Sequence, residues 1–306
     1  MSEITCFGPP PPDGCPPADQ AESYYGPCTW DGYFVEAWID GPFTDNGECC
    51  YEVISSSDFC GVGRPYTEAG QGIVAQTKAG ERGWLAEIGP VDVAGVSDDE
   101  RAQLAASWRR DGLLEHASVA AFSRLSLELM AVAAPPDLLS DVHAAALDEI
   151  AHAELCFAIA ARIDGHDAGP GGFPMSAETV RGDLAEVAAA AAREGCIDET
   201  LAAAMARRRA ELASEPEIAR ALHRIADDEE RHAELSWRIV RWALSVGGDD
   251  VRAAVRDVFA GAAGGHLAGD DVSGDGRIAA KDAARLQQQV LADVVIPCAA
   301  ALFARS

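Results

Sequence analysis

The chain has 306 residues, 48% of them hydrophobic, so it is long enough and apolar enough to fold around a sizeable core. With 50 acidic and 24 basic residues its formal net charge is −26, and such a surface repels phosphate groups. Nucleic acid and anionic membranes are therefore not expected as partners. No apolar run of about 18 residues is evident, so no transmembrane segment is expected.

The first part of the chain divides into a Pro-rich segment, residues 1–27, and a Cys-rich segment, residues 28–66. YFVEAWI at 33–39 and FTDNGECCYEVI at 43–54 are rich in β-forming residues, and the second contains an Asn-Gly turn, so a small β-hairpin module is predicted. Six cysteines fall here, namely Cys6, Cys15, Cys28, Cys49, Cys50 and Cys60. They are interpreted as a disulfide framework rather than a metal knuckle, because no Cys-x-x-Cys pair occurs.

The compartment stays open at this point. Disulfides are typical of an oxidising, extracytoplasmic environment. The N-terminus, MSEITCFGPPPPDGCPP, has no basic stretch and no apolar stretch, so it does not look like a secretion signal, and this favours the cytoplasm. Residues 67–97, rich in glycine, are predicted to link the Cys-rich module to the rest of the chain.

From Ser97 onward, Ala, Leu, Arg and Glu at helical spacing predict four long helices. Ser97 followed by Glu100 is a capping box that starts the first helix. The helices are expected at about 98–132, 137–163, 177–213 and 216–246, with Pro and Gly residues at the boundaries. Long helices with short connections pack antiparallel, so we expect an all-α four-helix bundle over residues 98–246. Residues 247–306 should add a C-terminal helical extension.

One charged octet occurs twice in this region, as DEIAHAEL at 148–155 and as DEERHAEL at 228–235, with six of eight residues shared. Helical spacing puts Glu149 beside His152, and Glu229 beside His232, on one face. The neighbours on those faces are mostly apolar (Ala145, Ala153 and Cys156; Leu222, Ile225, Ala226 and Ala233). Buried carboxylates need a partner, so a bound cation is predicted, and carboxylates with imidazoles favour a transition metal over calcium.

Two metal positions of this kind need about six ligands, so each of the other two helices should supply one acid. Glu115 in the first helix and Glu199 in the third lie on apolar faces. Glu194 is also flanked by apolar positions, but Glu199 is preferred because it lies about as deep in the bundle as Glu229. Glu194 is then a supporting acid or a seventh ligand. The alternative for all these residues is a set of surface salt bridges.

An aspartate begins each octet. Asp148 and Asp228 are placed to accept the free imidazole N–H of a metal-binding histidine and to fix its tautomer, either within one helix or across the bundle. Surface acids are the alternative interpretation.

One Glu from each of two helices, with a Glu-x-x-His from each of the other two, resembles the ferritin-like superfamily of di-iron carboxylate proteins. The order Glu115, Glu149 and His152, Glu199, Glu229 and His232 is the family order, and the resemblance covers about residues 98–246. It implies a ferritin-like antiparallel four-helix bundle that binds two Fe ions, with Mn or a mixed Mn/Fe pair as alternatives.

The resemblance further implies an oxidoreductase that reacts with O₂ or peroxide, such as an oxidase, a hydroxylase or a ferroxidase. Its substrate, a small molecule or ferrous iron, and its electron donor are not identified. All five tyrosines precede the bundle, so a tyrosyl radical is not expected. The alternative is a non-catalytic metal-binding or interaction protein with a structural bundle.

The tail contains DDVSGDGRIAAKD at 270–282, which resembles an EF-hand-like calcium loop over residues 271–282. The candidate Ca ligands are Asp271, Ser273, Asp275 and Asp282. The loop is single and ends in Asp rather than Glu, so an acidic Gly-rich turn between helices is the favoured interpretation and calcium the alternative.

Overall fold

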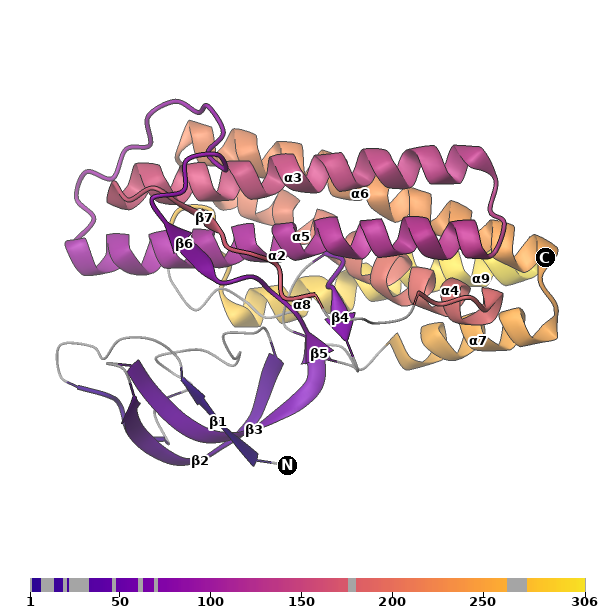
Figure 1. The fold of residues 1–306 in the computed structure, drawn as a ribbon, viewed down its shortest axis with the longest axis horizontal. Coiled ribbons are helices and arrows are strands. Elements are labelled where there is room, and N and C mark those ends of the chain that lie inside the picture. Colours follow the sequence, from indigo (N-terminus) through magenta and orange to yellow (C-terminus); the bar gives the residue numbers. More distant parts are fainter. Residues whose placement is uncertain are drawn as a thin grey trace.

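The computed structural model describes residues 2–6, 14–18, 21, 33–45, 48–59, 63–68, 71–175, 180–262 and 274–305. Over these residues the protein is mostly helical, with a small β-sheet near the N-terminus (Figure 1). The sheet lies to one side of a group of long helices that run along the length of the molecule.

The N-terminal sheet has three antiparallel strands, β1 (Ser2–Cys6), β2 (Tyr33–Asp45) and β3 (Glu48–Phe59), in the order β1-β3-β2. The predicted hairpin is confirmed as β2 and β3. The first strand was not predicted, since the Pro-rich segment that contains it lacks a β-forming run. A disulfide joins Cys15 to Cys49, and Cys50 is also disulfide-bonded, so the disulfide interpretation is confirmed for these cysteines. Cys28 and Cys60 lie outside the described residues.

The segment predicted as a linker packs against the helices along much of its length. Strands β4 (Thr67–Glu68) and β5 (Gln71–Gly72) pair with each other. Strand β6 (Thr77–Ala79) pairs with β7 (Ala168–Pro170), which comes much later in the chain. Further on, Ala86, Ile88, Val91 and Val93 cover one end of the helical core. Residues 63–68 and 71–97 are therefore part of the fold of the helical region.

Three of the four long helices have bounds close to those predicted. They are α2 (Asp98–Ala131), α3 (Pro136–Asp164) and α6 (Pro216–Val246). The capping box of Ser97 and Glu100 is present, and α3 ends at Gly165 with a left-handed backbone (φ 78°), a conformation that glycine adopts without strain. These local signals fixed the boundaries.

The third helix starts later than predicted and is not uniform. It consists of α4 (Leu184–Ala190), a π-helical stretch η1 (Ala191–Ile197) and α5 (Asp198–Leu212) in direct succession. Residues 180–183 are not helical, because the Asp183 side chain caps α4 by accepting hydrogen bonds from the backbone N–H groups of Ala185 and Glu186. The predicted start at 177 is therefore wrong, although residues 176–179 lie outside the described part.

The C-terminal extension contains α7 (Asp249–Gly261), α8 (Ala280–Val290), the π-helical stretch η3 (Leu291–Val295) and α9 (Ile296–Arg305). Buried valines of α7 and residues such as Ala283 and Val295 belong to the same core as the long helices. Within the described residues, the stretch Lys281–Ala304 is long and apolar enough, by length and composition alone, to cross a membrane. The sequence analysis did not expect such a stretch, and core helices meet the same criterion.

The helical core has two apolar halves with a polar layer between them. One half includes Leu104, Trp108, Ile159 and Leu222, and the other includes Phe122, Leu129, Val142 and Ile239. Along α2, α3 and α6, residues 115, 149–152 and 229–232 fall between the residues that contribute to the two halves. The acids and histidines singled out from the sequence therefore lie in the middle of the helices.

Candidate metal centre

The structure brings together the six residues predicted as ligands. We refer to them as the six-residue cluster: Glu115 from α2, Glu149 and His152 from α3, Glu199 from α5, and Glu229 and His232 from α6. They form two groups whose ligand atoms all lie within 4.8 Å of one another, one with Glu115 and His152 and the other with Glu199 and His232. Glu149 and Glu229 belong to both groups.

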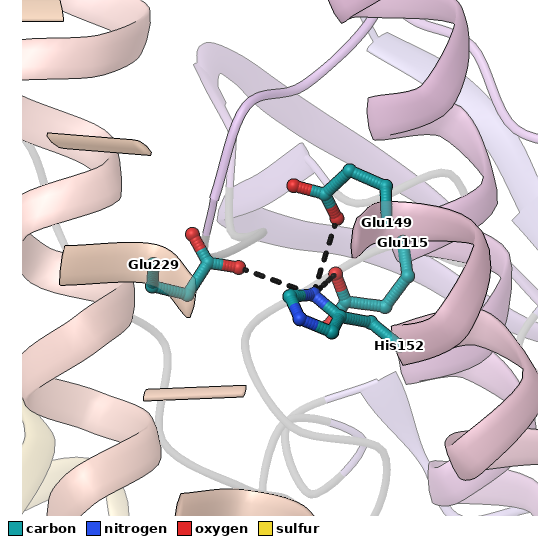
Figure 2. A group of neighbouring side chains, drawn as sticks. All are labelled: Glu115, Glu149, His152 and Glu229. Carbon is teal, nitrogen blue, oxygen red and sulfur yellow. Dashed lines mark ion pairs between the residues drawn. The ribbon is translucent and has the colours of Figure 1, made fainter. Parts of the chain in front are cut away.

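In the first group three carboxylates face one imidazole nitrogen (Figure 2). The Nδ1 atom of His152 lies 3.4 Å from Glu149 Oε2, 3.7 Å from Glu115 Oε2 and 3.7 Å from Glu229 Oε1. Glu229 reaches this point from α6, opposite the helices that carry the other three side chains. The side chains converge on a common point from different helices, as metal ligands do.

The two shared glutamates each turn one oxygen toward each histidine. Glu149 directs Oε2 to His152 and Oε1 to Nδ1 of His232, at 3.2 Å. Glu229 directs Oε1 to His152 and Oε2 to Nδ1 of His232, at 3.6 Å. Two carboxylates that each span two imidazole-lined positions have the geometry needed to bridge a pair of cations.

The cluster is buried and its polar atoms lack partners. Glu149, His152, Glu199, Glu229 and His232 are all at most 2% exposed. Among the described residues, no hydrogen-bond partner is found for either carboxylate oxygen of Glu149 or Glu199, for Oε2 of Glu229, or for Nδ1 of either histidine. Each such atom costs about 1–3 kcal/mol when left without a partner. Cations between the two groups would satisfy these atoms together, and four carboxylates with two imidazoles suit iron or manganese.

Each histidine is oriented by the aspartate of the other octet. Nε2 of His152 lies 3.0 Å from Asp228 Oδ2, and Nε2 of His232 lies 3.3 Å from Asp148 Oδ2. Because Nε2 donates its hydrogen to the carboxylate, Nδ1 is left facing the cluster as a ligand atom. Each aspartate therefore contacts a histidine on the other helix and not the one on its own helix, which is one of the two arrangements predicted.

Burial and neighbouring charges shift the pKa values of the cluster. Burial, with the charge of Glu149, raises the pKa of Glu115 to about 8. Burial and the charge of Glu229 raise the pKa of Glu199 well above its ordinary value. Burial alone would lower the pKa of His232, but its carboxylate neighbours outweigh it and raise that pKa to about 12. A metal ion would replace protons shared among these groups.

Glu194, the alternative ligand on the third helix, lies outside both groups. Its carboxylate accepts hydrogen bonds from Nη1 of Arg64, at 3.3 Å, and from Nη2 of Arg181, at 3.0 Å. The third helix therefore turns Glu199 toward the other acids and Glu194 toward arginines.

In the described part of the candidate calcium loop, the acids have other partners. The carboxylate of Asp275 accepts hydrogen bonds from the backbone N–H groups of Ser214 and Glu215, just before α6. Asp282 lies in the first turn of α8 and pairs with Arg285 at 3.3 Å. Asp271 and Ser273 lie outside the described residues, and calcium binding remains a prediction.

A small cavity of about 30 Å³ adjoins the cluster. Glu115 and Glu229 line it on one side, and Trp108, Asp111, Cys156 and Arg209 are among the residues that complete it. In this lining, the Asp111 carboxylate accepts hydrogen bonds at 2.8 Å from both Arg209 and Arg277. The same two guanidinium groups lie over the ring of Trp108, Arg209 at 5.0 Å from its centroid and Arg277 at 4.3 Å.

Arg64 was not predicted as part of the site. Its side chain is fully buried, and its Nε lies 3.4 Å from Glu199 Oε1. The sequence held one signal for it. Arg64 is one of only three basic residues among the first hundred, and it stands in a short glycine-rich stretch, GVGRPY at 61–66. Nothing in that stretch indicates which distant residue a buried arginine would contact.

Comparison of the chain with protein-family models, with curated proteins and with solved structures gave no significant match.

Proposed function

We propose that the chain is a ferritin-like di-iron carboxylate protein in which α2, α3, the α4–α5 segment and α6 form an antiparallel four-helix bundle around two metal ions. One position would be held by Glu115 and His152, the other by Glu199 and His232, and both by Glu149 and Glu229. The observation that carries this proposal is the pair of shared glutamates, each with one oxygen toward each histidine.

We further propose an O₂- or peroxide-reactive oxidoreductase. Two bound irons would supply redox chemistry, because both can change oxidation state together. The chain's own residues exclude water from the centre by burial, keep Nδ1 of each histidine available through Asp148 and Asp228, and hold protons at Glu115 and Glu199 when no cation is bound.

The cavity beside Glu115 and Glu229 supports a small reaction partner. Its volume of about 30 Å³ has room for roughly two water-sized molecules. O₂, peroxide or a ferrous ion is of that size.

The test is anaerobic loading of the full chain with Fe(II), followed by metal analysis and by absorbance after exposure to O₂. We expect about two irons per chain in the wild type and an oxidation-dependent absorbance band. The variant Glu229→Gln should lose both the stoichiometric iron and the absorbance band. Glu230→Gln is the matched control, because Glu230 is the next residue on the same helix but is exposed and pairs with Arg207. Metal that binds without reacting would favour the structural metal-binding protein, and absence of stoichiometric metal would refute the di-iron centre.

A further inference from the structure

Arg64 places a guanidinium group at the edge of the six-residue cluster from a segment outside the long helices. Its Nη1 donates to Glu194 Oε2 at 3.3 Å, and its Nη2 donates to Ser236 Oγ at 2.9 Å. Its Nε lies 3.4 Å from Glu199 Oε1, and the guanidinium covers the ring of Phe122 at 4.8 Å. The side chain is fully buried, so these contacts define one fixed position for it.

The backbone that carries Arg64 is anchored on α2. Ser118 Oγ donates a hydrogen bond to the carbonyl oxygen of Arg64 at 2.9 Å. Two residues on, the buried Tyr66 packs against Ala117 and Ala121. Gly63 has φ +100°, a conformation that favours glycine, and a Cβ there would lie 3.8 Å from Glu199 Oε2. The segment therefore passes directly beside the carboxylate of Glu199.

The π-helical stretch before Glu199 makes room for the guanidinium. Gly195 lies in η1, and a Cβ at this position would lie 2.5 Å from Arg64 Nη2 and would also clash with Ser236. π-Helical turns are rare and occur frequently at functional sites. Here the absence of a side chain at Gly195 lets Arg64 and Ser236 meet across the helix.

Among the acids of the cluster, Glu199 is the one whose ion pairs within the described residues include no histidine. Glu115, Glu149 and Glu229 each lie near an imidazole. In the ion pairs of the described residues, Glu199 has one cationic partner, which is Arg64. The charge of Arg64 is already offset by Glu194, so the guanidinium can orient Glu199 without presenting an unbalanced positive charge to a metal ion.

We propose that Arg64 is a positioning residue for Glu199, and hence for the metal position that Glu199 shares with His232. This inference rests on the proposed di-iron function. It makes the two metal positions unequal. Among the described residues, no arginine forms an ion pair with Glu115 or His152, whereas the position with Glu199 and His232 requires Arg64.

The test is an anaerobic Fe(II) titration of the full chain, with bound metal measured by equilibrium dialysis. In Arg64→Met we expect one iron to bind as in the wild type and the second to bind at least about 10-fold more weakly, the scale typical of groups that orient ligands. Arg64→Lys keeps the charge but lacks the planar fork, so it should weaken the second iron by a smaller factor. Arg181→Met is the control, since it removes a partner of Glu194 and Glu128 without contact to Glu199.

The outcomes separate the two proposals. Two irons bound equally well by wild type and Arg64→Met would overturn the role of Arg64 and leave the di-iron function standing. No stoichiometric iron in the wild type would overturn both. Equal weakening in Arg181→Met would show a general effect of the buried ion pairs and would also refute the inference. If Arg64→Met does not fold, Arg64→Lys decides, and an unchanged second iron in that variant refutes the proposal.

Discussion

The substitution Glu199→Gln should raise the stability of the metal-free protein and reduce its response to metal. Glu199 is fully buried, and neither of its oxygens has a hydrogen-bond partner among the described residues. Gln has the same shape and is neutral without the proton that Glu199 must take up when no cation is bound. Its carbonyl oxygen can accept from Nε of Arg64, now 3.4 Å from the carboxylate, and its amide can donate to Glu229, whose Oε2 also lacks a partner. The free energy of unfolding should rise by about 2 kcal/mol, which corresponds to roughly 4 °C in Tm for a chain of this size.

The same substitution removes one metal ligand. A metal present at about 1,000 times its Kd stabilises the protein by about 4.1 kcal/mol per position. Loss of the position held by Glu199 and His232 should therefore shrink the metal-induced rise in Tm by roughly 8 °C. The assay is thermal unfolding monitored by circular dichroism, with and without Mn(II), which avoids oxidation during heating.

A lower Tm for metal-free Glu199→Gln would refute the reasoning, and so would an undiminished metal response. Glu128→Gln is the matched control. Glu128 is a buried acid of α2 that pairs with Arg181 at 3.2 Å, away from the six-residue cluster. This variant should change stability to a similar extent with and without metal, so its metal-induced rise in Tm should equal that of the wild type.

Three further predictions concern the surroundings of the centre. Asp228→Asn removes the charge that holds Nε2 of His152, so metal affinity measured against a competing chelator should fall about 10–100-fold. Gly195→Ala places a Cβ 2.5 Å from Arg64 Nη2, so urea unfolding should show a loss of about 1–3 kcal/mol. Burial raises the pKa of Asp111, but its two arginine partners outweigh burial and hold that pKa below its ordinary value. The resulting stability is present above about pH 4 and is lost as the pH falls through the lowered pKa, so Asp111→Asn should be less stable by about 3 kcal/mol at pH 7 and approach the wild type in acid.

Matched variants test each of these reasons. Asp227→Asn changes an exposed neighbour of Asp228 and should leave metal affinity unchanged. Gly182→Ala adds a Cβ that meets nothing within 4 Å, so a loss equal to that of Gly195→Ala would contradict the steric explanation. For Asp111→Asn, a stability difference that persists undiminished below pH 4 would show that its charge is not the cause.

Local signals in the sequence predicted the helices and the faces that carry the cluster. The capping box at Ser97, the left-handed Gly165 and Pro216 act within one turn of the chain, so they determine helix ends wherever the helices pack. The Glu-x-x-His spacing likewise determines a face without any tertiary information. The repeated octet added the strongest evidence, because two identical faces with buried charge are most simply explained by a shared ligand.

Contacts between side chains on different helices could not be predicted from local spacing. Periodicity shows that Asp148 and Asp228 lie near the histidines, but it does not distinguish a partner in the same helix from one across the bundle. The late start of the third helix has a local origin instead, since Asp183 caps α4 although the apolar pattern extends further back. Arg64 and Glu194 are separated by 130 residues, and no periodic pattern connects them.

The two octets make the centre nearly symmetric, and its surroundings make it unsymmetric. Each octet supplies one shared glutamate, one histidine and one aspartate that orients the histidine of the other octet. The side chain of Glu115 is 17% exposed and borders the small cavity, whereas Glu199 is fully buried beneath Arg64. A small molecule in this cavity would therefore contact Glu115 and Glu229 rather than Glu199. The position of Glu199 and His232 is closed by a segment that precedes the long helices, so the centre depends on more of the chain than the four helices that supply its ligands.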